Sequence, residues 1–307
     1  MRLGLVVVYL VKPGNEALLD LHLRQIERCT SVPYTIYASA NRLDAACRAR
    51  LERDPHVRVC SPPTTPLRGG SENAHYLELL TEQAAADDVT HIATLHVDAF
   101  PVRMGWAGAL AAQLSEARPL AAIERLENGD HKPHSAFMLF TRDWYLSERP
   151  RYMLTPAERK TLACRRYALR YPHVPDTGSG YGYRLYRRRL QWVSLKRSNA
   201  AEDHYMLGSV YGDWIFHLGA AARDVKLFRA DARLLSRVGV LRSLRGWLAS
   251  QLSPEQREWL HQRRPAFVDS LAARGADNEA AFEAIKARLL AGPDDYLTYL
   301  RTGQHLR

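Results

Sequence analysis

Apolar residues follow two periods along the first hundred residues of the chain. Residues 3–10 form a continuous apolar run that ends shortly before a Pro-Gly pair, which is typical of a strand buried on both faces. Shorter runs at 34–38, 57–60 and 90–95 are separated by segments in which apolar residues recur every three or four positions, as in amphipathic helices. This alternation predicts an α/β, Rossmann-like fold whose central sheet is mostly parallel and flanked by helices.

The middle of the chain continues this pattern less regularly. Further strand-like runs lie at 120–123, 134–140 and 191–195, and a Pro-Asp-Thr-Gly sequence at 175–178 is typical of the start of a helix. Residues 141–175 show no clear period. We therefore expect three more strands, with a helix that begins at Asp176 before the last of them.

The last quarter of the chain is patterned as helices only. The clearest of these helices covers 278–291 and ends at a Gly-Pro pair. Leucines line one face of 241–252 among several arginines, a stripe that packs either on its own domain, which we favour, or on an anionic membrane face. We expect a catalytic-type sheet domain over 1–232 and a helical C-terminal extension over 233–307.

Composition narrows the class of protein. With 307 residues, 46% hydrophobic and 25% charged, the chain resembles an ordinary globular protein and contains no apolar run of the ~20 residues that cross a bilayer. The apolar start is short and lacks a small-residue cleavage site, so it is interpreted as a strand and not as a signal peptide. Four scattered cysteines without CxxC spacing argue against a zinc-binding module or a disulfide scaffold and favour the cytoplasm.

Positive charge is concentrated in one block. The formal net charge is +10, and residues 151–200 carry twelve Lys and Arg against Glu158 and Asp176. Such a block either contacts phosphates, nucleic acid or an anionic membrane, or is a solvated arginine-rich surface. Tyrosines alternate with these arginines, as in single-strand binders, but no nucleic-acid motif is present, so nucleic acid is not an expected partner.

Two segments carry side chains suited to catalysis or metal binding. In an open parallel sheet, ligands bind beyond the carboxyl ends of the strands. His96 and Asp98 directly follow the run at 90–95, and in an extended segment both point to one side, with Val97 turned inward. They are able to share a divalent cation, although an isolated His-x-Asp is more often a structural turn.

The second segment begins at Asp176. A carboxylate at a helix N-terminus is stabilised in its charged form and accepts a proton, although a plain helix cap is the commoner role. The glycines that follow suggest a close approach of the backbone to a bulky group. A third feature, His217, lies in an apolar segment and gains interest only beside a metal.

In this order the segments resemble the nucleotide-sugar-binding GT-A fold of glycosyltransferases, especially inverting family two. Leu95-His96-Val97-Asp98-Ala99-Phe100-Pro101 stands where that family has its acidic DXD-type motif. His134-Ser135-Ala136-Phe137-Met138-Leu139-Phe140 matches its acceptor-side strand, and Asp176 followed by Arg184-Leu185 matches the helix headed by its base. The chain departs from the family in having His96 for the first acid and Ala38-Ser39-Ala40-Asn41 where acids usually follow strand two.

The resemblance implies a transferase that moves a sugar from a nucleotide-sugar donor to a hydroxyl with inversion. Asp176 is then the base, and a divalent metal, Mn or Mg, is held by three residues. The implied metal ligands are His96, Asp98 and His217; the implied donor-binding residues are Tyr9, Lys12, Asn41, Arg68, His96 and Asp98; the implied acceptor-binding residues are His134 and Ser135.

The implied acceptor is a polysaccharide, a glycolipid (lipid-linked) or a small natural product. The protein is expected in the cytoplasm, and in peripheral contact with the inner membrane face if the acceptor is lipid-linked. Two other functions stay open. One is another nucleotide-using transferase on a similar sheet, for which the loop after the first strand lacks the expected glycines. The other is a non-catalytic protein that binds nucleic acid or a membrane surface through its basic block.

Overall fold

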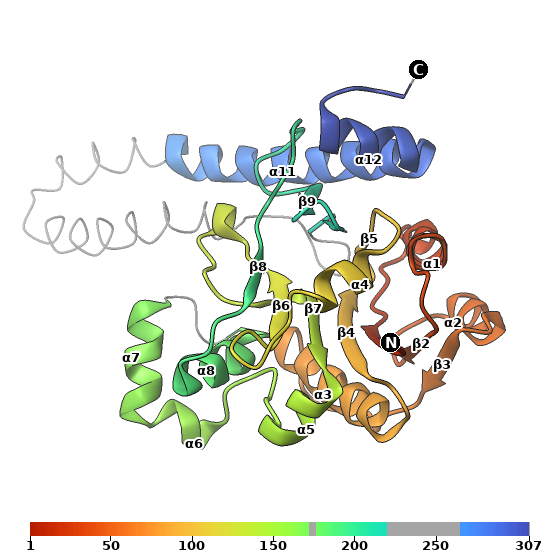
Figure 1. Ribbon diagram of the computed structural model, residues 1–307. Coiled ribbons are helices and arrows are strands. Elements are labelled where there is room, and N and C mark those ends of the chain that lie inside the picture. Colours follow the sequence, from red (N-terminus) through yellow and green to blue (C-terminus); the bar gives the residue numbers. More distant parts are fainter. Residues whose placement is uncertain (172–175, 220–264, 307) are drawn as a thin grey trace, which may run out of the picture.

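The sheet is the centre of the molecule. The structure is a computed structural model that describes residues 1–171, 176–219 and 265–306 (Figure 1). Seven strands form one sheet in the order β3-β2-β1-β4-β7-β6-β8, and β7 alone runs antiparallel to its neighbours, which confirms the mostly parallel α/β sheet. The strands are β1 (Leu3–Val8), β2 (Tyr34–Ser39), β3 (Val57–Cys60), β4 (His91–His96), β6 (Leu120–Ile123), β7 (His134–Thr141) and β8 (Val193–Leu195).

Helices cover both faces of the sheet. Alternate residues of β1 divide between two apolar clusters, with Leu5 and Val7 facing α1 and Val6 and Val8 facing α3. This division explains why the strand reads as apolar without interruption. The helices of this part are α1 (Glu16–Cys29), α2 (Ala45–Arg53), α3 (Gly70–Ala86), α4 (Trp106–Ala111), α5 (Arg142–Glu148), α6 (Pro156–Arg159), α7 (Leu162–Arg170) and α8 (Ser179–Arg188).

Element ends differ from the sequence prediction where local capping decides them. The segment 141–175 showed no period, and its described part, 141–171, holds three short helices. Each is preceded by a threonine whose hydroxyl accepts a backbone N–H (Thr141, Thr155 and Thr161). Helices of 4 to 9 residues are too short to establish a visible period.

A small second sheet stands at the carboxyl end of β4. It contains β5 (Ala99–Pro101), β10 (Ile215–His217) and β9 (Ser209–Tyr211), all antiparallel, in the order β5-β10-β9. The register of β10 on β5 places His217 opposite Ala99. This pairing joins two stretches of chain that are more than a hundred residues apart in sequence.

The C-terminal helices share the core of the sheet domain. They are α11 (Pro265–Ala291) and α12 (Pro293–Thr302), and Figure 1 shows them lying along one side of the molecule near α1 and β9. Ile285, Leu289 and Leu300 belong to the same apolar cluster as α1, and Lys286 donates a 2.8 Å hydrogen bond to Asn15. The pair Gly292-Pro293 ends α11 as expected, but Pro293 then opens α12.

Some expectations fall outside the described residues. The leucine stripe at 241–252 and the boundary between 1–232 and 233–307 are among them. Within the described residues no helix is both long and apolar enough to traverse a bilayer. The four cysteines are buried and unpaired with one another.

Candidate metal and donor site

The carboxyl ends of β1 and β4 lie side by side. Val8 is the register partner of His96, and from β1 the chain continues to β2 on one side while β4 lies on the other. The strand order therefore reverses between β1 and β4, which is where open α/β sheets bind ligands.

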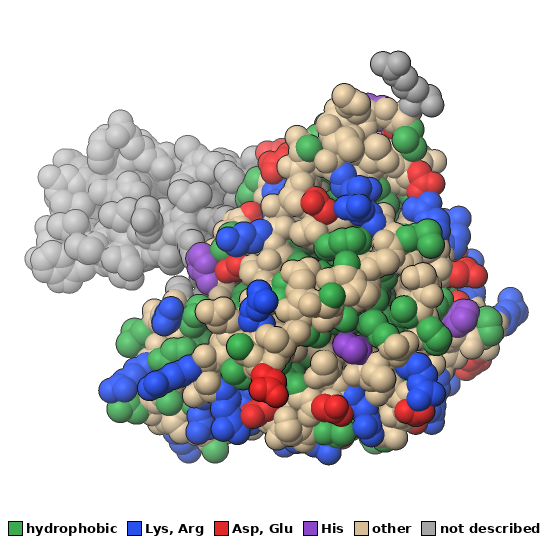
Figure 2. Space-filling view, viewed as in Figure 1, with side chains coloured by type: hydrophobic (Ala, Val, Ile, Leu, Met, Phe, Trp, Pro, Cys, Tyr) green, Lys and Arg blue, Asp and Glu red, His purple; other side chains and the backbone are tan. Residues whose placement is uncertain are grey.

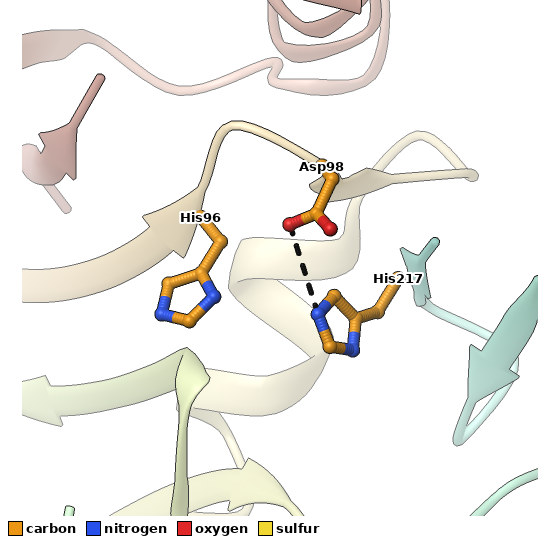
Figure 3. Close-up of side chains that lie close together, drawn as sticks. All are labelled: His96, Asp98 and His217. Carbon is orange, nitrogen blue, oxygen red and sulfur yellow. Dashed lines mark ion pairs between the residues drawn. The ribbon is translucent and has the colours of Figure 1, made fainter. Parts of the chain in front are cut away.

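Three side chains converge at this edge. Figure 3 shows His96 at the end of β4, Asp98 on the loop behind it and His217 at the end of β10, all directed toward one another. One ligand atom from each lies within 4.8 Å of the others, and His217 Nε2 is 3.7 Å from Asp98 Oδ1. Asp98 and His217 are 5% and 3% exposed, so water screens the interaction between their polar atoms only weakly.

The route by which His96 and Asp98 meet differs from the one predicted. Val97 and Asp98 form a turn and not a continued strand, with Val97 buried as expected. The small sheet then fixes Asp98: the backbone N–H of Leu218 donates to its carbonyl oxygen at 2.9 Å, and that of Gly219 donates to Oδ2 at 3.1 Å.

A third imidazole borders the cluster. The ring of His134, at the start of β7, has its centroid 6.0 Å from that of His96 and 5.8 Å from that of His217. Burial, and then the neighbouring Arg125 and Lys132, hold the pKa of His134 well below its usual value, so the ring is neutral. Its Nδ1 accepts the N–H of Ala136 at 3.1 Å, which leaves the proton on Nε2.

His134 therefore presents an N–H donor, whereas a metal ligand needs a free lone pair. The hydroxyl of Ser135 lies 3.3 Å from Nε2 of His96 and helps to orient that ring. A donor ring beside a cation-binding cluster suits a phosphate or sugar oxygen.

Two buried cations, which the sequence analysis missed, lie behind the imidazoles. Arg125 is 3% exposed and donates to Glu127 and to the carbonyl of Met206, both at 3.3 Å. Lys132 is 2% exposed. Both follow β6, which is parallel to β4, so their segment returns to the same edge of the sheet. Their position shortly after a predicted strand is the one feature of the sequence that could have marked them as candidate site residues.

Asp176 lies next to Lys132. Its Oδ2 is 3.3 Å from Lys132 Nζ, and 31% of its side chain is exposed. The next residue, Thr177, donates through Oγ1 to the carbonyl of Gly70 at the start of α3. The carboxylate thus stands between α3 and the segment that carries His134. Helix α8 begins later than expected, with Gly178 as its N-cap, so Asp176 is not itself the cap.

The glycines around α8 have a structural role. A Cβ on Gly178 would lie 2.5 Å from the carbonyl oxygen of Pro133, and one on Gly180 would lie 2.1 Å from that of Arg151. The close backbone approach that the sequence suggested is present, but the partner is the protein's own chain.

The other residues expected to bind the donor lie in different settings. Tyr9 is fully buried, with its hydroxyl 3.1 Å from Nδ1 of His22, so its ring belongs to the core beneath the site. Burial raises its pKa well above the usual range. Asn41 donates to the carbonyl of Pro62 at 3.0 Å, and Arg68 is exposed beside the start of α3. Lys12 is partly exposed after β1.

Comparison with known proteins gives likenesses in structure and none in sequence. No protein-family profile matches the chain, and no curated protein matches its sequence. Among solved structures, the apo form of the WbbM bifunctional glycosyltransferase is similar over 48% of this chain, with 11% sequence identity and a TM-score of 0.37. The match covers 33% of the WbbM chain, so the matched part of this chain spans about a third of that protein's length.

Proposed function

We propose that the chain is an inverting glycosyltransferase that transfers a sugar from a nucleotide-sugar donor to an acceptor hydroxyl. The observation that carries this proposal is the meeting of His96, Asp98 and His217 where the strand order reverses. The order of motifs along the chain, which resembles the GT-A fold, supports it independently of the geometry.

The three side chains fit a divalent metal. Metal–ligand bonds of roughly 2.1 Å put two ligand atoms of one ion about 3–4 Å apart, and the Asp98–His217 distance of 3.7 Å lies in that range. Two imidazoles with one carboxylate suit manganese and its first-row neighbours better than magnesium, which prefers oxygen ligands. When bound, such an ion supplies positive charge beside the donor's diphosphate.

The chain's own groups would complete the donor site. The diphosphate would lie over the ends of β1 and β4, where Lys12 and Arg68 provide further positive charge and the Nε2–H of His134 donates to an oxygen. Asn41 would lie near the nucleobase. His134 and Ser135 would border the acceptor from the start of β7.

Asp176 is the proposed base. Its carboxylate lies 3.3 Å from the ammonium of Lys132 and is 31% exposed, so an acceptor hydroxyl can approach the oxygens that would take its proton. The acceptor oxygen would attack the anomeric carbon as the bond from that carbon to the diphosphate oxygen breaks on the opposite face. The hydroxyl proton would pass to Asp176, and the configuration at the anomeric carbon would invert.

A thermal-shift screen of UDP-, GDP- and dTDP-sugars, with and without manganese, tests the proposal. A donor present at a hundred times its Kd stabilises the fold by about 2.7 kcal/mol, which raises the Tm by a few degrees in a chain of this size. We expect one nucleotide class to do so, and more strongly with manganese.

His217→Ala should remove the manganese-dependent part of that shift. His131→Ala is the matched control, because His131 is an exposed histidine outside the cluster. The proposal fails if no nucleotide sugar raises the Tm, and the metal site fails if both variants retain the full manganese effect.

A further inference from the structure

A cavity lies near the amino ends of the strands, away from the candidate site at their carboxyl ends. Its wall includes Gln191 and Trp192, which directly precede β8, whereas His96 ends β4. Strands β8, β6 and β4 run in the same direction, so Trp192 lies at the amino ends of the strands and His96 at their carboxyl ends. These two ends are about 20 Å apart for a strand of six residues. The cavity is therefore separate from the proposed reaction centre.

The cavity is basic and aromatic. Its volume is about 740 Å³, enough for a small oligosaccharide or a molecule of drug size. Three kinds of side chain line it, namely guanidinium groups, aromatic rings and uncharged side chains that are not aromatic. The lining residues are Ala163, Arg170, Tyr171, Tyr186, Arg187, Arg189, Leu190, Gln191 and Trp192. Figure 2 shows basic side chains gathered with apolar ones at the lower left, over α7 and α8.

The arginines of the cavity are not neutralised within the described part of the chain. Arg170, Arg187 and Arg189 form no ion pair with any described residue, and no acidic side chain is among the lining residues. On α8, by contrast, Arg184 and Arg188 both lie within 4 Å of Glu148. These two arginines outside the cavity are thus paired with an acid, whereas the three that line it are available to an anion.

Arg189 reaches the cavity from the end of a helix. It caps the C-terminus of α8 with φ of 55°, a left-handed conformation in which glycine or asparagine is usual. This turn ends α8 and brings the Arg189 side chain into the wall of the cavity, beside Leu190 and Gln191.

The aromatic rings limit the shape of the ligand. Tyr171 and Tyr186 meet at 83° with centroids 6.5 Å apart, so they form a corner and not a row of parallel platforms. A single strand of nucleic acid needs successive faces on which bases stack. A sugar ring, with an apolar face and polar edges, fits a corner of aromatic and guanidinium groups.

We propose that this cavity binds an acidic oligosaccharide, with carboxylates paired to Arg170, Arg187 and Arg189 and a sugar face against Tyr171, Tyr186 or Trp192. In assigning a glycan the inference rests on the proposed function, since a glycosyltransferase meets a growing or accepting chain. The cavity would hold that chain at a distance from the point of transfer.

Direct binding of defined sugars tests the inference without any donor. The probe is a hexamer of galacturonic acid, measured by calorimetry on the whole chain and compared with neutral maltohexaose. We expect the acidic hexamer to bind and the neutral one to bind at least about tenfold more weakly, since charge-assisted contacts are the strong ones.

Arg170→Gln/Arg187→Gln should weaken binding of the acidic hexamer about tenfold or more. Arg165→Gln/Arg166→Gln is the matched control, because it removes the same charge from exposed arginines outside the cavity and should change binding less than about twofold. Circular dichroism melting shows whether each variant folds. Nucleotide-sugar thermal shifts should be unchanged in both, which separates this inference from the proposed function.

Several results would overturn the inference. One is that the two double variants weaken binding of the acidic hexamer equally. Another is that the acidic hexamer does not bind at all, and a third is that an oligothymidylate binds as tightly as the acidic hexamer. The inference is also overturned if vesicles of phosphatidylglycerol bind the protein through the exposed Leu162 and Leu169 of α7 and the acidic hexamer does not compete with them.

Discussion

The contact between Lys132 and Asp176 permits a quantitative test of the site. The Lys132 side chain is 3% exposed, and its ammonium lies 3.3 Å from the carboxylate of Asp176. Removing one partner of a fully buried pair costs about 3–5 kcal/mol, because the other charge is left unpaired. Since 31% of Asp176 is exposed to water, we expect Asp176→Ala to lower the free energy of unfolding by about 2 kcal/mol.

A double-mutant cycle isolates this interaction. Urea denaturation of Asp176→Ala, Lys132→Met and the double variant gives the coupling energy, which we expect to be on the order of 1–2 kcal/mol. The double variant should be more stable than Asp176→Ala alone, because it contains no buried ammonium. Additive losses in the three variants would refute the reasoning, and Asp176 would then be an ordinary surface acid.

Further predictions concern packing and metal preference. Gly180→Ala should destabilise the fold by about 2–3 kcal/mol in urea melts, because its Cβ would meet a backbone carbonyl at 2.1 Å. Gly108→Ala, with nothing within 4 Å, should be neutral or stabilising by up to about 1 kcal/mol, and equal losses in the two would contradict this account. Tyr9→Phe should cost about 1–3 kcal/mol by leaving buried His22 without its partner, and an unchanged stability would argue against that bond. If the proposed metal site exists, His96→Asp should increase magnesium-supported donor binding in titrations, whereas unchanged metal preference would remove His96 from the ligands.

The sheet could be predicted from the sequence because each buried strand or helix shows its burial in its own pattern of apolar residues. The run at 3–10 is apolar throughout since both faces of β1 are covered, and this pattern requires no knowledge of the rest of the chain. The position of His96 at the carboxyl end of β4 follows in the same way from the apolar run that precedes it.

Other parts of the site depend on pairing that leaves no periodic trace. His217 reaches Asp98 through the three-residue strands β10 and β5, which are too short to be recognised before they pair. Arg125 and Lys132 are charged, and sequence patterns place such residues on the surface unless the fold supplies partners for them. The resemblance to a known fold supplied His217, and no pattern supplied the buried cations.

Crystals grown with manganese and a nucleoside diphosphate provide the most direct measurement, through the anomalous scattering of the metal. The account predicts a manganese peak about 2.0–2.3 Å from one atom each of His96, Asp98 and His217, in contact with the diphosphate. A diphosphate bound elsewhere on the molecule, or a manganese peak that excludes these three side chains, would contradict it.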